Sequence, residues 1–318
     1  MTLIGYHASH EQFAPSELLR LVSEAEQAGF ACAKSSDHFH PWSERQGHSG
    51  FAWSWLGAAM QATRFGFGMI SAPGYRYHPA VLAQAAATIG EMFPGRLWLS
   101  LGTGEAINEA ITGEYWPEKA ERNARLRECV DIFRALFDGE TVTHRGRVTV
   151  VEAKLYSRPA HAVPIYGAAV TQATAAFCGP WADGLLTTGG DIETVRRVVG
   201  AFRENGGHDK PVHIQHALSW APQEATAAEE ALDQWSAPSV GGDAAWDLRQ
   251  PRDFDAVGKM VTLEKLRQFI AISSDPGRHR ADIEALASLK PAAVHLHCVG
   301  RNQRAFIEMA AKNLIAIG

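Results

Sequence analysis

Eight short apolar segments, each followed by a longer stretch of different periodicity, run through the 318 residues of this chain. The apolar segments cover residues 3–6, 30–35, 64–73, 96–102, 163–170, 183–189, 212–221 and 292–299. The stretches between them repeat apolar residues every three or four positions, as at Leu18, Leu19, Val22 and Ala25, which indicates helices. Strands that alternate with helices favour a parallel sheet, and eight such units predict an α/β fold of the (β/α)8 TIM-barrel type.

An open, doubly wound sheet is the alternative that the same alternation allows. The count of eight, and the absence of a composition break at mid-chain, favour one barrel domain over residues 1–318. Near 138–160 the segment "TVTHRGRVTVVEAKL" predicts a β-hairpin excursion with a turn at Arg145–Gly146. Residues 222–260 are polar and irregular, which predicts an insertion, and 261–272 and 280–290 are predicted to be helical.

Composition and charge narrow the classes of partner. The net charge is −5 without any block rich in Lys and Arg, so we expect no nucleic-acid partner. No apolar stretch approaches 18 residues and no signal peptide is recognisable, so we expect a cytoplasmic protein without a membrane partner. The expected partner is a small-molecule substrate.

Polar residues gather where the second predicted strand ends, in "SSDHFHPW". Function in a barrel lies at the carboxyl ends of the strands, so this position is a candidate site. A carboxylate beside an imidazole, as in Asp37 and His38, suits a general base. His38 and His40 form an H-x-H pair that could bind zinc, and His295 and His297 repeat the spacing. That metal-hydrolase hypothesis lacks the further ligands it needs, and we expect no metal.

The fourth strand ends in Gly102-Thr103-Gly104-Glu105, and the third in Gly68-Met69-Ile70-Ser71. Small residues at strand ends let a flat ligand approach the backbone. The first of these motifs is neither a dinucleotide fingerprint nor a P-loop. Glu105 could act as an acid there, and Trp42 could cap a ligand ring.

Taken together, "SSDHFHPW", "SWLGAAMQAT", "YRYHPAVLAQAAATIGEMFPGR" and "LGTGEAINE" resemble the bacterial luciferase-like superfamily of flavin and deazaflavin oxidoreductases. The nearest branch is similar to glucose-6-phosphate dehydrogenases that use the deazaflavin coenzyme F420. The resemblance implies a (β/α)8 barrel, a homodimer and a flavin-type ring over the strand ends. It also implies catalytic roles for three residues, namely His38 as the base that takes a hydroxyl proton, Trp42 as the aromatic that stabilises the intermediate, and Glu105 as an acid near the ring.

The resemblance implies a set of cofactor-binding residues as well. Asp37 would line the ring pocket, and a non-proline cis peptide bond would lie behind the ring near Met69 and Ile70. The glycine motif would contact the ring and its polar chain, and a loop after the fifth strand would bind phosphate. These two groups are Gly102, Thr103, Gly104 and Asn108, and Ala168, Ala169, Val170 and Thr171.

Two departures from the dehydrogenases change the expected cofactor. Where the dehydrogenases have a Gly-Gly-Pro loop after the fifth strand, this chain has Val170-Thr171-Gln172. Where they have a lysine that binds the sugar phosphate after the sixth strand, this chain has Thr187-Thr188-Gly189-Gly190. The chain is also similar to a sub-branch predicted to use FMN. The leading hypothesis is therefore an FMN-dependent oxidoreductase that oxidises NADH or NADPH and passes the electrons to flavin, oxygen or another acceptor. An F420-dependent dehydrogenase of an alcohol or sugar, and a flavin-dependent monooxygenase, are the alternatives.

Overall fold

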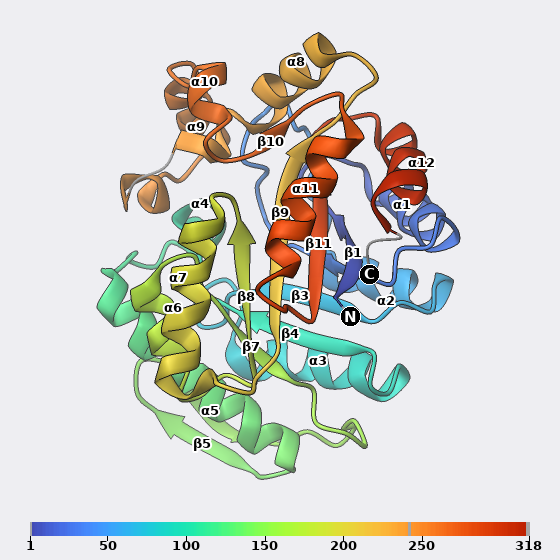
Figure 1. Ribbon diagram of the computed structural model, residues 1–318. Coiled ribbons are helices and arrows are strands. Elements are labelled where there is room, and N and C mark those ends of the chain that lie inside the picture. The colour runs from blue at the N-terminus through green and yellow to red at the C-terminus, as the bar shows by residue number, and fades with distance from the viewer. Residues whose placement is uncertain (1, 241–242, 316–318) are drawn as a thin grey trace.

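Eight parallel strands form a closed barrel in the computed structural model, which describes residues 2–240 and 243–315. Around the ring, β9, β11, β1, β2, β3, β4, β7 and β8 pair in this order, and pairing of β8 with β9 closes it. Their bounds are β1 Leu3–Ala8, β2 Cys32–Ser35, β3 Phe67–Ser71, β4 Leu97–Leu101, β7 Ile165–Ala168, β8 Gly184–Gly189, β9 Val212–Ser219 and β11 Ala293–Cys298. The predicted TIM barrel is confirmed (Figure 1).

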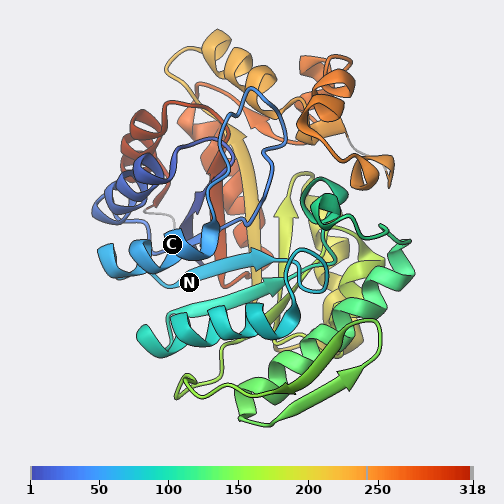
Figure 2. The same ribbon diagram turned by 180° about the vertical axis from the view of Figure 1, so that it is seen from behind.

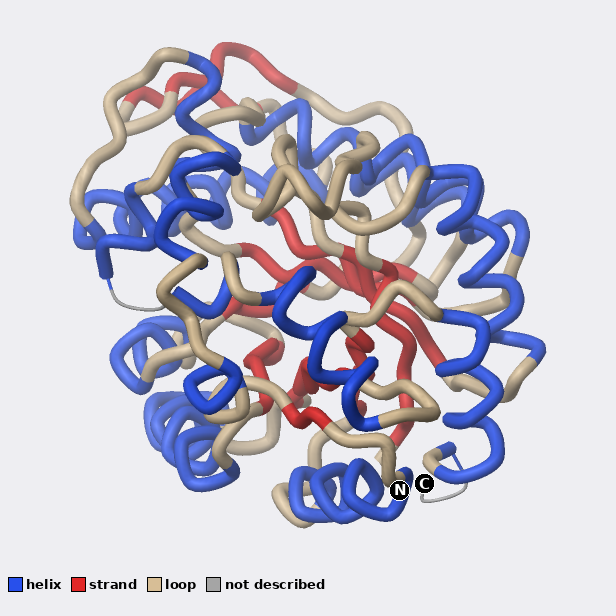
Figure 3. Tube along the Cα trace, turned by 90° about the horizontal axis from the view of Figure 1, so that it is seen from above, coloured by secondary structure: helices blue, strands red, loops and turns tan. Residues whose placement is uncertain are grey.

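Helices surround the strands, as the view from above shows (Figure 3). In α1, Leu18, Leu21 and Val22 are buried, because their spacing places them on the one face turned towards the barrel. The outer helices are α1 Pro15–Gln27, α2 Ala52–Ala62, α3 Pro79–Met92, α5 Lys119–Asp138, α6 Gln172–Cys178, α7 Ile192–Phe202, α11 Pro276–Ala287 and α12 Gln303–Asn313. Shorter turns are α4 Ala106–Glu109, η1 Ala110–Thr112 and the π-turn η2 Arg203–Gly207. Within the described residues, no helix has the length and apolarity that crossing a membrane requires.

The predicted hairpin is present as β5 (Val142–Arg145) and β6 (Thr149–Ala153), which pair antiparallel. It lies outside the barrel beside α5 (Figure 2). Val148 and Val150 are buried, so the hairpin packs its apolar side inwards and leaves its polar side exposed.

The segment after β9 is more regular than its polar composition predicts. It forms α8 Glu224–Trp235, η3 Pro238–Val240, η4 Asp243–Asp247, α9 Pro251–Gly258 and α10 Leu263–Leu266, near the carboxyl ends of the strands (Figure 1). Ala227 and Ala231 lie one turn apart and are fully buried, which gives α8 an apolar stripe. The helix predicted over 261–272 is wrong beyond its first turns, because Ala271 and Ile272 pair with the end of β9 as β10.

Imidazole and indole rings fill the lower part of the barrel. The rings of His213 and His295 stack with centroids 5.2 Å apart, and Trp98 lies 4.5 Å from His213. Gly68 makes room for this indole, since a Cβ there would lie 2.0 Å from Trp98. Above this layer, towards the carboxyl ends of the strands, β1, β2, β9 and β11 contribute His7, Lys34, Gln215 and His297.

Candidate active site

A cavity of about 1030 Å³ opens at the carboxyl ends of the barrel strands. This volume is at the upper end of the roughly 300–1,000 Å³ range of ligand pockets, which suits a cofactor ring together with a small substrate. Fourteen site residues were predicted, and the cavity is lined by thirteen of them: Asp37, His38, Trp42, Ile70, Gly102, Thr103, Gly104, Glu105, Asn108, Ala168, Ala169, Val170 and Thr171. Met69 is the exception. It is fully buried on the opposite side of β3, because consecutive strand residues alternate in direction.

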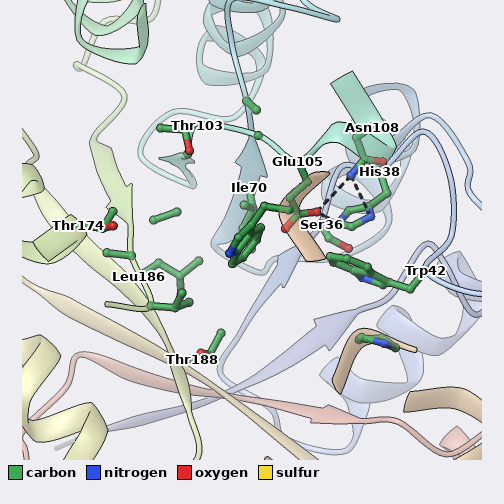
Figure 4. A pocket seen from close by; sticks show the side chains of 18 of the residues that line it. Ser36, His38, Trp42, Ile70, Thr103, Glu105, Asn108, Thr174, Leu186 and Thr188 are labelled. Atoms are coloured by element: carbon green, nitrogen blue, oxygen red, sulfur yellow. Dashed lines mark hydrogen bonds and ion pairs between the residues drawn. The ribbon is translucent and has the colours of Figure 1, made fainter. Parts of the chain in front are cut away.

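His38 lies between two carboxylates in this cavity. Its Nε2 is 3.6 Å from Oε1 of Glu11 and 3.9 Å from Oε2 of Glu105. Figure 4 shows His38, Glu105 and Asn108 turned towards one another, with Trp42 beside them. Trp42 packs 5.1 Å from the His38 ring on one side and 5.2 Å from Phe254 on the other. The imidazole is therefore held by contacts on three sides.

The orientation of Asn108 determines which nitrogen of His38 carries a proton. Oδ1 of Asn108 accepts the backbone N–H groups of Phe39 and His40, at 2.9 and 3.3 Å. Its Nδ2 therefore faces Nδ1 of His38 at 3.2 Å, and Oε2 of Glu105 at 3.4 Å. An amide N–H can only donate, so Nδ1 accepts, and the neutral imidazole carries its proton on Nε2.

The two carboxylates that flank His38 lie in environments that move their pKa values apart. Burial opposes ionisation of Glu11, but His38 and the hydroxyl of Ser36, which donates to Oε1 at 2.7 Å, outweigh it and lower the pKa to about 2. Burial raises the pKa of Glu105; His38 opposes this shift, and the charge of Glu11 adds to it. A pair of this kind keeps one carboxylate ionised and leaves the other able to hold a proton.

Asp37 was predicted to line the ring pocket; it belongs to the cavity wall, and its carboxylate is fully buried among protein groups. Ser71 donates to Oδ2 at 2.7 Å, Tyr77 donates to Oδ1 at 3.1 Å, and the Arg76 guanidinium is 3.3 Å from Oδ1. These partners occupy both oxygens, so Asp37 braces the cavity wall. The cis peptide bond expected near Met69 and Ile70 does not occur, since every peptide bond between described residues is trans.

Behind this wall, Arg76 also approaches Glu109, with Nε 3.7 Å from Oε1. Burial raises the pKa of Glu109 to about 7, against the opposing charge of Arg76. The adjacent Gly104 has a φ of +76°, and a Cβ there would lie 2.6 Å from Cγ of Glu109. Glycine is therefore required at this point of the motif both by backbone conformation and by space.

The opposite wall consists of small and hydroxyl-bearing residues. Thr174, Leu186 and Thr188 are seen across the cavity from His38 in Figure 4, and Ile70 lies between them and Glu105. Gly102 and Ala168 both line the cavity with little or no side chain, so a flat ligand can approach the backbone at the ends of β4 and β7. Thr171 accepts the N–H of Thr174 and thereby caps α6. These residues fit a planar ring placed between the apolar wall and the His38 cluster.

Glu11 and Lys119 are among the charged groups of the cavity that the sequence analysis missed. Glu11 lies three residues beyond the end of β1, so its position near a strand end was the available signal. Lys119 begins α5 and donates from Nζ to Oγ1 of Thr103 at 2.9 Å, which brings a cation into the cavity. Its place at the start of a helix twenty residues long gives no such signal in the sequence.

The H-x-H pairs have other partners than a metal. Nδ1 of His40 contacts the carbonyl oxygen of Ile107 at 2.7 Å, outside the His38 cluster. His295 and His297 both point into the barrel, where Nε2 of His295 lies 2.9 Å from Nδ1 of His213. Within residues 2–240 and 243–315, no three His, Cys, Asp or Glu side chains are arranged to bind a metal ion.

Comparison with known proteins identifies several relatives. Residues 1–292 match the family described as luciferase-like monooxygenase. F420-dependent glucose-6-phosphate dehydrogenases of Segniliparus rotundus and Mycobacterium avium are each 35% identical to this chain, over 98% of it and 96% of theirs. Among solved structures, an F420-dependent secondary alcohol dehydrogenase in complex with an F420-acetone adduct has 28% identity and a TM-score of 0.91, with complete coverage of both chains. The monooxygenase RslO1 of Streptomyces bottropensis, at 21% identity and a TM-score of 0.74, shares the fold.

Proposed function

The chain belongs to the luciferase-like monooxygenase family and is an oxidoreductase, and within this family we propose that it is an F420-dependent dehydrogenase of a hydroxyl-bearing substrate. The proposal rests on one observation. Glu11 and Glu105 flank Nε2 of His38, and their surroundings move their pKa values in opposite directions. Such a cluster can hold a hydroxyl oxygen and take its proton.

A deazaflavin ring could lie against the small-residue wall that includes Gly102 and Ala168, with the remaining volume open beside His38. When bound, F420 supplies a two-electron acceptor for hydride. The relatives that are 35% identical over nearly the whole chain are named for F420, which supports this cofactor ahead of the FMN expected from the sequence. The similar monooxygenase is 21% identical, a level that speaks for the fold alone.

We assign His38 as the group that positions the substrate oxygen. Because its Nδ1 accepts from Asn108, the neutral imidazole offers an N–H and not a lone pair on its Nε2 side. This differs from the base role implied by the resemblance. Glu105 is then the proton acceptor, since a carboxylate with a raised pKa is the stronger base once it is ionised. Glu11 stays ionised, and its charge, 3.6 Å from Nε2 of His38, favours the N–H on that side while leaving it free for the substrate oxygen.

The charge distribution favours an uncharged alcohol over a sugar phosphate. The end of β8 carries Thr187, Thr188 and Gly189, which provide no cation for a phosphate. Lys119 lies at another point of the cavity and is bonded to Thr103. Two further cations, Arg122 and Arg249, line the cavity from other segments, so what a phosphate lacks is a charge-assisted contact from the end of β8 itself.

The test is to mix the purified protein with F420 and propan-2-ol, glucose or glucose 6-phosphate, and to follow the visible absorbance of the oxidised cofactor. We expect bleaching with an alcohol. In a parallel arm, oxygen and NADH or NADPH are supplied with FMN. FMN-stimulated oxidation of NADH or NADPH, without bleaching of F420 by any alcohol or sugar, would overturn the proposal in favour of the flavin hypothesis.

The homodimer and the cytoplasmic location remain predictions. Sedimentation of the purified protein tests whether it is a homodimer.

A further inference from the structure

A buried amine and an imidazole form a second polar group at the floor of the cavity, on the side of β1 and β2. We propose that His7, held by Lys34, presents its Nε2–H to the cavity as a hydrogen-bond donor for a carbonyl-type oxygen of the bound ligand. This subsite is separate from the His38 cluster. Only the naming of its ligand rests on the proposed function.

Lys34 is fully buried within the barrel, and its amine contacts two side chains. Nζ lies 2.9 Å from Nδ1 of His7 and 2.5 Å from Oε1 of Gln215. Lys34 itself does not line the cavity, whereas His7, Gln215 and His297 do. The amine thus lies directly behind the side chains that form the floor.

A chain of hydrogen bonds orients Gln215. Its Nε2 donates to Nδ1 of His297 at 3.2 Å, and Nε2 of His297 lies 3.2 Å from Oε1 of Gln12. Gln12 then donates to Oε1 of Gln234, and Gln234 donates to the carboxylate of Asp233 on α8. Along this chain each donor points away from Lys34, and Gln12 Nε2 is fixed in addition by the carbonyl oxygen of Val299 at 2.7 Å. Gln215 must therefore turn Oε1 to Lys34, which identifies the amine as the donor at this end of the chain.

The same amine determines the tautomer of His7. Burial lowers the pKa of His7 well below its ordinary value, and the charge of Lys34 lowers it further, so the imidazole is neutral. When the Lys34 amine is protonated it has no lone pair and can only donate, so Nδ1 of His7 accepts and the ring proton is on Nε2. The polar contacts of the described residues include no acceptor for this N–H, although His7 is only 4% exposed. A buried donor without a protein partner, on a residue that lines the cavity, is matched to an acceptor on a ligand.

An uncharged N–H backed by an amine selects an oxygen or nitrogen lone pair. Two groups in the proposed reaction carry such a lone pair. One is a carbonyl at the edge of the cofactor ring, and the other is the ketone oxygen of the product. Both sources use the same chemistry, and binding measurements separate them. The imidazole has no lone pair left for a proton, so His7 is assigned to positioning and not to proton transfer.

The experiment compares His7→Leu, which removes the donor, with His7→Gln, whose amide can accept from Lys34 and still donate to the cavity. Dissociation constants of F420 and FMN are measured by fluorescence quenching, and acetone is used as the carbonyl probe through its inhibition constant. We expect His7→Leu to weaken the binding of either the cofactor or acetone by about tenfold. His7→Gln should restore most of that affinity. A loss for F420 or FMN assigns the ring carbonyl, and a loss for acetone assigns the product. Weakened binding of FMN with no binding of F420 would support the subsite and overturn the proposed cofactor.

His213→Leu is the matched control, because His213 is another buried histidine of the barrel and does not line the cavity. It should lower stability and leave all affinities unchanged. An independent readout is the ¹⁵N NMR spectrum of the histidine side chains, in which His7 should appear as the Nε2–H tautomer and lose this preference in Lys34→Met. Unchanged affinities in a folded His7→Leu protein, or an Nδ1–H tautomer, would overturn the proposal.

Discussion

The side-chain amide of Asn108 donates to Nδ1 of His38, although the two residues are 70 positions apart in the chain. Because Phe39 and His40 occupy the amide oxygen, Asn108 cannot reverse its orientation without losing both of those hydrogen bonds. The proton of the neutral imidazole is thereby directed to the Nε2 side, between Glu11 and Glu105. This one contact therefore decides whether Nε2 of His38 acts as a hydrogen-bond donor or as a base.

Asn108→Asp should reverse this tautomer. One carboxylate oxygen can still accept the N–H groups of Phe39 and His40, while the other requires a proton on Nδ1. We expect the ¹⁵N NMR signals of His38 to change to the Nδ1–H form, and turnover to fall by about tenfold or more. Unchanged turnover in a variant with the reversed tautomer would contradict the donor role.

Glu105→Gln should abolish most of the turnover and leave cofactor binding intact. Loss of a general base costs about 10²- to 10⁴-fold in rate. In the wild type, alcohol oxidation should increase with pH as Glu105 loses its proton, over a range above that of an ordinary glutamate because its pKa is raised. The variant should lack this limb of the pH–rate profile. Glu91→Gln, an exposed substitution on α3, is the control and should retain the wild-type profile.

Glu109→Gln should change the pH dependence of stability. The pKa of Glu109 is raised from 4.5 to about 7, so the folded protein binds more protons than the unfolded chain between these values. The resulting stabilisation is fully present below pH 4.5 and is lost as the pH rises through 7. Relative to the wild type, the variant should therefore gain stability between pH 5 and pH 8, by about 3 kcal/mol at most. Urea unfolding at several pH values measures this difference, and parallel curves for the two proteins would contradict it.

Lys34→Met should show the opposite trend. Burial lowers the pKa of Lys34 from 10.5 to about 7, so between these values the unfolded chain binds more protons than the folded protein. The wild type should therefore gain stability relative to the variant as the pH rises from 7 to 10, by up to about 1.4 kcal/mol per pH unit. Comparing the two proteins cancels the titration of buried tyrosines and cysteines over the same range. A difference that stays constant with pH would show that Lys34 does not titrate in this way.

Local patterns in the sequence predicted the barrel and the edge at which its cavity lies. Alternating apolar and amphipathic segments depend on side-chain spacing alone, and parallel strands bring their carboxyl ends to one edge wherever the residues there come from. For this reason His38, Glu105 and the small residues at 102–104 and 168–171 could be expected together. In the segment after β9, α8 and α9 were missed, because alanine pairs such as Ala227 and Ala231 in α8 give a weak apolar signal.

The sequence by itself thus determined the fold, the strand ends that form the cavity and the residue types found there. Only the tertiary structure decided which polar atoms meet. It engaged both oxygens of Asp37 with Ser71, Tyr77 and Arg76, turned Met69 away from the cavity and brought Glu11 beside His38. The physical reason is that hydrogen bonds and pKa shifts depend on strand register and on contacts between residues far apart in the chain. Local spacing carries no information about either.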